Sequence, residues 1–203
     1  AATLLVVGLA GVAGGALTLI LAGVAVSSLA GALTSLVLNL SPNPFAASEI
    51  MFWLLGSLAD RSWMHVALAG PFILAGMGLL LLLARDLEAL TLGEDAARSL
   101  GIPLGRTRAL ALGGTAAAVG AGVAVAGASG FVGLVVPHLL RPVVGHSPSR
   151  LLPAAALGGA SFLLAADVAA RLIAPERDLK LGVLTALVGA PFFLRLVWTT
   201  RRR

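Results

Sequence analysis

Few residues of this chain could carry chemistry, and the first set lies in the stretch GFVGLVVPHLLR. There Pro137, His138 and Arg141 follow one another closely inside an apolar run. A histidine can act as a base or as a ligand, but no Ser–His–Asp spacing accompanies this one. A lone histidine in apolar surroundings is more often a packing residue, so catalysis is the weaker interpretation of His138.

A second set, in ADVAAR, combines Asp167 with Arg171. A spacing of four places both side chains on one face of a helix, where they can pair. Ionisable groups inside a membrane span are costly and either pair or face a cavity. Two hypotheses stay open: a structural ion pair near the outer end of the span, and a pathway lining or proton relay.

A third set lies in TLGEDAARSLGIPLG, where Gly93 and Gly101 bracket a short helical stretch. Glu94 favours the start of this helix through the helix dipole, and Arg98 follows it at a spacing of four. The segment is either an ordinary solvated loop or a rigid docking element for a cytoplasmic partner, with an apolar face formed by residues 92, 96, 97 and 100. The docking hypothesis assigns contacts to Leu92, Gly93, Glu94, Ala96, Ala97, Arg98, Leu100, Gly101, Ile102 and Pro103.

The composition restricts the class of protein that must position these residues. Of the 203 residues 59% are hydrophobic and 11% are charged, and the mean hydropathy is +1.02. Soluble domains carry about 25% charged residues, so the sequence predicts an all-α polytopic membrane protein. With no Cys and three His we expect no metal site. The absence of GxxxxGK[ST] argues against a phosphate-binding loop of its own, and the net charge of +5 is not taken to indicate nucleic-acid binding.

Apolar runs of about 20 residues predict the membrane spans. The chain begins inside an apolar run, so we expect residues 1–12 to be the tail of an earlier span and the chain to be part of a longer polypeptide. Residues 45–63 are short, amphipathic and Trp-bearing, which predicts an interfacial helix and a loop. We expect about six spans: 16–40, 64–84, 109–127, a short one at 131–144 broken near Pro137, 151–173 and 181–198.

Basic residues predict the orientation of these spans, because cytoplasmic loops carry an excess of Lys and Arg. One side holds the 85–108 segment, the 141–150 turn and the C-terminus, with nine basic residues. The other side holds three: Arg61, Arg177 and Lys180. The nine-to-three excess predicts that the first side is cytoplasmic.

Several motifs in order resemble the FecCD family, the permease subunits of ATP-driven importers for iron–siderophores, haem and cobalamin. They are LILAGVAVSSL, EIMFWLLGSL, LEALTLGEDAARSLGIPL, GFVGLVVPHLLR, LLAADVAAR and LGVLTALVGAPFFLRLV, and they cover residues 16–198. One departure is Lys180, which stands where the family commonly has proline. The family signature is expected at Gly130, Phe131, Gly133, Pro137, His138 and Arg141.

The resemblance implies a permease of roughly ten spans, of which this chain lacks the N-terminal ones, in one transmembrane domain over residues 1–203. It implies that residues 85–108 form the cytoplasmic coupling loop in a bacterial cytoplasmic membrane. The implied partners are two ABC ATPase subunits, an extracytoplasmic substrate-binding protein and a second permease subunit. No cofactor is expected on this chain, with ATP and Mg²⁺ used by the ATPase. Two other hypotheses are a proton-coupled carrier using Asp167, Arg171 and His138, and a membrane-embedded enzyme.

Overall fold

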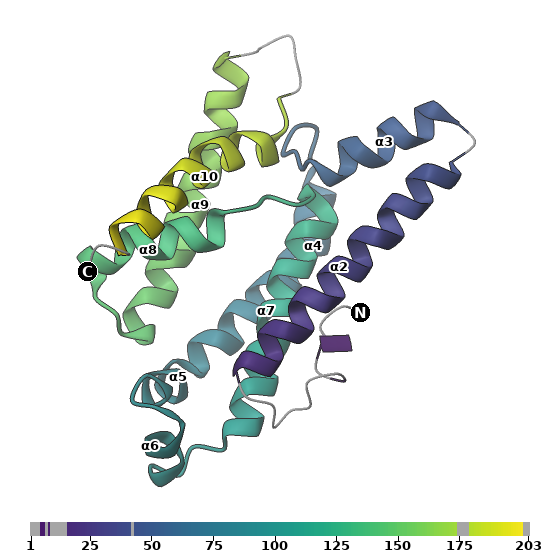
Figure 1. Ribbon diagram of the computed structural model, residues 1–203. Coiled ribbons are helices and arrows are strands. Elements are labelled where there is room, and N and C mark those ends of the chain that lie inside the picture. The colour runs from purple at the N-terminus through teal and green to yellow at the C-terminus, as the bar shows by residue number, and fades with distance from the viewer. Residues whose placement is uncertain (1–4, 7, 9–15, 42, 174–178, 201–203) are drawn as a thin grey trace. The chain divides into compact units, whose positions relative to one another are not determined.

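The computed structural model describes residues 5–6, 8, 16–41, 43–173 and 179–200, and all regular structure within these ranges is helical (Figure 1). The all-α fold predicted from composition is therefore confirmed. The expected tail at residues 1–12 and the three terminal arginines lie largely or wholly outside the described residues. The helices are α2 (Ala16–Leu40), α3 (Pro44–Leu54), α4 (Trp63–Leu82), α5 (Ala84–Leu90), α6 (Glu94–Ser99), α7 (Leu104–Ala126), α8 (Val132–Val144), α9 (Pro148–Ile173) and α10 (Leu181–Thr200).

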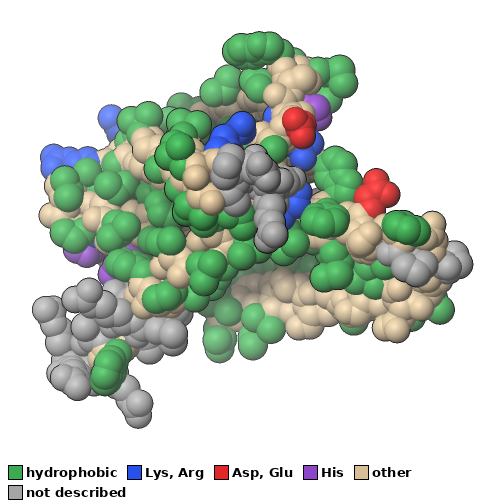
Figure 2. Space-filling view, turned by 90° about the horizontal axis from the view of Figure 1, so that it is seen from above, with side chains coloured by type: hydrophobic (Ala, Val, Ile, Leu, Met, Phe, Trp, Pro, Cys, Tyr) green, Lys and Arg blue, Asp and Glu red, His purple; other side chains and the backbone are tan. Residues whose placement is uncertain are grey.

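Four helices of the described chain are long and apolar enough to cross a membrane: α2, α4, α7 and α9. Two further expected spans are helical but shorter, namely α8 and the apolar part of α10, Leu181–Phe192. Large apolar side chains are exposed on many of these helices, and hydrophobic groups predominate on the face drawn in Figure 2. Such a surface suits lipid or other membrane helices rather than water.

Contacts divide the chain into two compact units. The first unit contains residues 1–50 and 72–119, and the second contains residues 51–71 and 120–203. The boundary passes through α3, α4 and α7, so each of these helices contributes to both units. The prediction of one permease domain over residues 1–203 stays a prediction.

In the first unit, α4 and α7 pack with almost no side chain between them at one point. A Cβ atom placed on Gly76 would meet the backbone carbonyl of Gly114, and one on Gly114 would lie 3.0 Å from the carbonyl oxygen of Gly76. Small residues at such crossings let helix backbones approach closely, which strengthens van der Waals packing in a membrane. This crossing brings the middle of α7 against the second half of α4.

In the second unit, α8 and α9 form a helical hairpin, and α10 packs against both. Gly158 of α9 receives the side chains of Val136 and Leu140 from α8. Gly159, the twelfth residue of α9, faces the side chain of Val132 at the start of α8. Because α9 has 26 residues, α8 begins near the middle of the α9 length.

The structure corrects the expected break near Pro137, because α8 continues through both Pro137 and Pro142. The interruption lies before the helix, at the non-helical residues 127–131. A 13-residue helix is about 20 Å long, which is shorter than the roughly 30 Å bilayer core. By its length alone, α8 is too short to cross that core unaided.

Candidate functional site

The segment predicted to dock a partner is a compact element in the first unit. It comprises α5, α6 and the first turn of α7, joined by short connections, and we call residues 84–108 the α5–α6 element. The two glycine corners expected from the sequence are present: Gly93 precedes α6 with φ +104°, and Gly101 follows it with φ +79°. Both angles are ones that L side chains rarely adopt.

The end of α6 has the hydrogen bonds of a Schellman motif. The N–H of Gly101 donates to the carbonyl of Arg98 at 2.9 Å, and the N–H of Ile102 donates to the carbonyl of Ala97 at 3.1 Å. The side chain of Ile102 packs onto the cluster that contains Ala97. The chain thus reverses while the carbonyls of Ala97 and Arg98 accept hydrogen bonds, and Pro103 follows.

The orientation of Ala97 corrects one expectation. Ala97 is 0% exposed and forms a buried cluster with Ala89 and Leu104, against which Leu90 and Ile102 pack. We expected Ala97 on the face offered to a partner, but it faces α5 and α7 instead. The physical reason is that a helix this short is held by packing one of its faces on its neighbours, and Ala97 lies on that face.

Polar contacts also tie the α5–α6 element together. Thr107, which is 1% exposed, donates to a carboxylate oxygen of Asp86 at 2.9 Å. Glu94 pairs with Arg108, and its other oxygen lies 3.5 Å from Arg98, the pair expected from the spacing of four. The Thr107–Asp86 hydrogen bond joins α7 to α5, and the Glu94–Arg108 ion pair joins α6 to α7. All three helices of the element are therefore connected by polar contacts.

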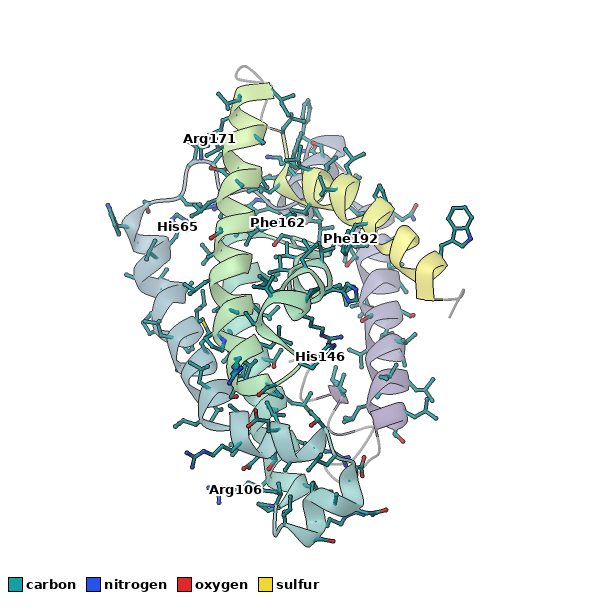
Figure 3. All side chains as sticks on the ribbon, turned by 90° about the vertical axis from the view of Figure 1, so that its left-hand side faces the viewer. His65, Arg106, His146, Phe162, Arg171 and Phe192 are labelled. Atoms are coloured by element: carbon teal, nitrogen blue, oxygen red, sulfur yellow. The ribbon has the colours of Figure 1, made fainter. Side chains whose placement is uncertain are left out.

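Two large apolar side chains lie exposed on the mixed polar and apolar outer surface of the α5–α6 element. Leu92 is 69% exposed and Leu100 is 62% exposed. Gly93, Gly101 and Pro103 are exposed as well. Arg106 lies exposed on the first turn of α7 (Figure 3). Two large exposed leucines beside glycine corners are suited to contact a protein surface.

Two of the expected signature residues, Phe131 and His138, lie against α10. Phe131 adopts φ +65° at the start of α8, and Gly189 of α10 lies directly against its side chain. The ring of His138 lies edge-on to that of Phe192, with centroids 6.1 Å apart. Figure 3 places Phe192 on α10. Arg141 is exposed in the last turn of α8, and Gly130, Gly133 and Pro137 complete the set in and beside this helix.

The pair Asp167–Arg171 forms as the spacing predicts. The Nε of Arg171 donates to Asp167 at 2.8 Å, near the C-terminal end of α9 (Figure 3). Asp167 is 18% exposed at its side chain and Arg171 is 60% exposed. No hydrogen bond in the described residues joins this pair to His138, so the three residues proposed for a relay are not brought together.

Sequence reasoning missed a junction of three backbone segments in the second unit. The N–H groups of Leu181 and Gly182 each donate at 3.0 Å, to the carbonyls of Gly56 and Leu55 respectively. The N–H of Ser57 donates to the carbonyl of Ala126 at 2.8 Å. We call these contacts the glycine junction. Its sequence signal was weak, because Gly56, Gly127 and Gly182 are far apart in the chain.

The close approach at the glycine junction requires residues without side chains. A Cβ atom on Gly127 would lie 2.6 Å from the Cα of Gly56 and 2.7 Å from the carbonyl oxygen of Trp53. One on Gly182 would collide with the carbonyl of Leu55. The junction therefore fixes the first turn of α10 to the segments that follow α3 and α7.

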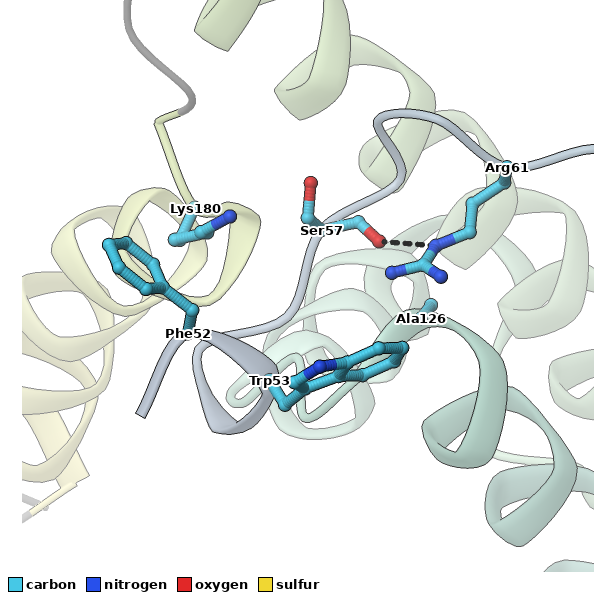
Figure 4. A pocket seen from close by; sticks show the side chains of 6 residues that line it. All are labelled: Phe52, Trp53, Ser57, Arg61, Ala126 and Lys180. Carbon is cyan, nitrogen blue, oxygen red and sulfur yellow. Dashed lines mark hydrogen bonds between the residues drawn. The ribbon is translucent and has the colours of Figure 1, made fainter. Parts of the chain in front are cut away.

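Beside the junction, Arg61 and Lys180 line one hollow, together with Phe52, Trp53, Ser57 and Ala126 (Figure 4). The charge pattern assigns both cations to the same side of the membrane, as their proximity requires. Arg177, the third basic residue of that side, lies outside the described residues. Among the described residues, no group of three or more His, Cys, Asp or Glu side chains is placed to hold a metal ion.

The chain has several apolar helices long enough to span a membrane, and the α5–α6 element connects two of them, α4 and α7. These features define a polytopic helical membrane protein. The chain belongs to the FecCD transport family, whose model matches residues 1–199. This confirms the resemblance inferred from the ordered motifs.

Comparison with curated proteins finds close relatives. The chain is 44% identical over 180 residues to the cobalamin import system permease protein BtuC of Halobacterium salinarum, covering 89% of this chain and 48% of that one. It is 39% identical over 185 residues to the hemin transport system permease protein HmuU of Yersinia pestis, covering 91% and 55%. The Fe(3+) dicitrate transport system permease protein FecD of Escherichia coli is 39% identical over 179 residues, covering 88% and 56%. The chain thus spans about half the length of these relatives.

A solved structure shares the fold. An inward-facing metal-chelate type ABC transporter matches with a TM-score of 0.83 and 36% identity, covering 91% of this chain and 60% of that one. The helical membrane fold predicted from sequence therefore agrees with an ABC transporter chain.

Proposed function

We propose that this chain is the permease part of an ABC importer that moves a bulky metal chelate inward across the cytoplasmic membrane. Membership of the FecCD transport family carries this proposal. Relatives named for cobalamin, hemin and iron(III) dicitrate import suggest the cargo class: a metal complex within a large organic ligand. The chain itself is not an enzyme in this proposal, because ATP is hydrolysed by a partner.

The α5–α6 element would be the coupling element between ATPase and spans. Three features support the rigidity of this element: the buried cluster around Ala97, the hydrogen bond from Thr107 to Asp86, and the ion pair between Arg108 and Glu94. A rigid element transmits displacement, whereas a loose loop would absorb it. When ATP draws two ATPase subunits together, a docked element moves with them, and the helices that flank it, α4 and α7, would be displaced in turn.

The proposed assembly includes two ATPase subunits, a second permease subunit and an extracytoplasmic substrate-binding protein. No cofactor is assigned to this chain; ATP and Mg²⁺ would be held by the ATPase. The multi-pass chain would lie in the cytoplasmic membrane, with residues 85–108 and 141–150 on the cytoplasmic side. The nine-to-three distribution of basic residues supports this orientation.

The exposed leucines provide the test of coupling. Leu100→Glu places a charge on the outer surface of the element without touching its core, because Leu100 is 62% exposed. We expect the variant permease to fold with an unchanged melting temperature but to lose most ATPase co-purification and ATP-driven uptake. Ser149→Glu, which adds the same charge at an exposed position outside the α5–α6 element, is the matched control and should retain both. Normal co-purification and uptake by Leu100→Glu would contradict the coupling role.

A proton-coupled carrier is the alternative function, and the geometry gives it no support. His138 contacts Phe192, whereas Asp167 bonds Arg171, within the described part of the chain. Uptake into proteoliposomes separates the two functions. An ABC importer needs ATP and its ATPase and works after a protonophore collapses the pH gradient, whereas a proton-coupled carrier stops.

A further inference from the structure

A small open hollow of about 110 Å³ in the second unit is not used by the proposed coupling mechanism. We call it the Arg61 hollow. Two aromatic rings, two cations and a serine meet there (Figure 4). Phe52 and Trp53 are 57% and 55% exposed, so the walls of the hollow are accessible from outside the chain. The predicted topology places only three basic residues on this side of the membrane, and two of them, Arg61 and Lys180, line this hollow.

Arg61 is half-buried and held in a defined orientation. Its guanidinium lies 5.3 Å from the centroid of the Trp53 ring, and its Nε donates to the backbone carbonyl of Ser57 at 3.4 Å. The terminal nitrogens make no ion pair or hydrogen bond among the described residues, and the adjacent Asp60 makes no ion pair there either. Within the described part of the chain, the two terminal nitrogens of Arg61 are thus available to donate to a ligand.

Lys180 supplies the second cation of the hollow. Its ammonium lies 5.0 Å from the centroid of the Phe52 ring. Two positive charges that line one hollow repel each other, and the repulsion is stronger where protein partly excludes water. An anion in the hollow would be attracted by both side chains, so the charge of these two residues favours an anionic ligand.

The glycine junction joins the backbone segments that carry the two cations of the Arg61 hollow. Lys180 immediately precedes Leu181, whose N–H donates a hydrogen bond to the carbonyl of Gly56. The N–H of Ser57 donates to the carbonyl of Ala126, and both of these residues line the hollow. The two cations are thus attached to segments already joined by backbone hydrogen bonds. A site that needs little ordering on binding loses less affinity to conformational entropy.

We propose that the Arg61 hollow is an oxyanion site that binds a carboxylate or phosphate group. Arginine binds both groups through two parallel hydrogen bonds, and lysine adds a point charge. Two sources share this chemistry: a small solute on the outer side of the membrane, and the phosphate of a lipid headgroup at the interface, where tryptophan is enriched. The proposal is independent of coupling, because binding requires neither ATP nor an ATPase.

The test measures binding to the whole permease, purified in a neutral detergent and stripped of lipid. One arm titrates citrate and inorganic phosphate. The other titrates phosphatidylglycerol, with dioleoylglycerol, which lacks the phosphate, as its control. The readouts are the rise in melting temperature that a ligand of the folded state produces and, for lipids, the bound mass in native mass spectrometry.

We expect saturable binding in one arm that Arg61→Gln weakens by about tenfold or more, as loss of charge-assisted hydrogen bonds predicts. Lys180→Gln should weaken it less, and Arg61→Lys should restore part of it. Arg150 is an exposed basic residue outside the hollow, so the Arg150→Gln variant should bind the ligand as tightly as the unaltered protein. Binding of phosphatidylglycerol but not dioleoylglycerol identifies a lipid phosphate, and binding of citrate or phosphate identifies a solute.

Two results would overturn the proposal. One is the absence of saturable binding in both arms by the unaltered permease. The other is binding that neither Arg61→Gln nor Lys180→Gln weakens. If Arg61→Gln lowers the melting temperature without ligand, the Lys180→Gln comparison decides, because this change leaves the Arg61–Ser57 contact in place.

Discussion

At the scale of single residues, Gly101 shows how backbone geometry constrains the α5–α6 element. Its φ of +79° lets the N–H groups of Gly101 and Ile102 turn back onto α6. Any residue with a Cβ atom is strained in this region of backbone space. The motif thus depends on the identity of one residue more than on the composition of the loop.

Gly101→Ala should lower the free energy of unfolding by about 1–2 kcal/mol, the cost of a left-handed conformation for an L-residue. Thermal unfolding of the purified permease measures this change. Gly113→Ala in α7 is the matched control, because that glycine has no positive φ and open space around it. The control should be neutral or stabilising by up to about 1 kcal/mol, since alanine favours helix. Equal effects of both changes would argue against the role of Gly101.

Asp167→Asn should remove the ion pair with Arg171 and reduce stability by only about 1 kcal/mol or less, because Arg171 is largely exposed. If the pair is structural, uptake by the variant should keep the pH profile of the unaltered protein. Uptake measured across a pH series, with protein amounts matched, checks this expectation. A pH-dependent loss of uptake at normal protein levels would revive the relay hypothesis.

At the scale of elements, the α5–α6 element separates its interior from its outer surface. Ala97 lies inside, whereas Leu92 and Leu100 lie outside. This division changes what a bulky residue at position 97 would do. It would disturb the packing of α6 on α5 and α7 before it could obstruct a partner.

Ala97→Trp should destabilise the element by about 1–3 kcal/mol or more, the range for overpacking a filled core. We expect the melting temperature and ATPase co-purification to fall together. Leu100→Glu should reduce ATPase co-purification without lowering the melting temperature. Comparison of the two variants therefore distinguishes a buried residue, Ala97, from a surface residue, Leu100. An Ala97→Trp permease with unchanged stability would contradict the buried position.

Gly182→Val should disrupt the glycine junction, since its side chain would meet the backbone carbonyls of Leu55 and Ala128. Backbone atoms cannot yield as a flexible side chain can, so we expect a loss of about 1–3 kcal/mol and weaker binding in the Arg61 hollow. Gly122→Ala, where no atom lies within 4 Å of the added Cβ, should have neither effect. Melting temperature and the binding titration provide the two measurements.

At the scale of the whole molecule, the charge distribution predicts which ends of the spans face the cytoplasm. Single cysteines at the exposed positions Ser99 and Ser149 should resist an impermeant thiol reagent in intact cells and react after the membrane is opened. A cysteine at Ser62, exposed on the opposite side, should react without opening. The chain has no cysteine of its own, so labelling reports the introduced residue. Ready labelling at positions 99 and 149 in intact cells would reverse the topology.

The sequence by itself determined the features that depend on local pattern and composition. Apolar runs indicated the membrane helices because every backbone polar group must be satisfied within lipid. Glycine and proline indicated the corners around residues 94–99, and a spacing of four indicated both Glu94–Arg98 and Asp167–Arg171. Ordered motifs indicated the FecCD family. Each of these signals involves residues near one another in the chain.

Only the tertiary structure decided the features that join distant segments. Periodicity could not place Ala97 inward, because a six-residue helix presents no unambiguous face until α5 and α7 cover one. Pro137 suggested a break, yet packing of α8 on α9 and α10 keeps the helix continuous and moves the interruption to residues 127–131. Arg61 and Lys180 are 119 positions apart, and backbone hydrogen bonds at Gly56 and Gly182 bring them to one hollow. Such contacts depend on three-dimensional packing, which no local pattern encodes.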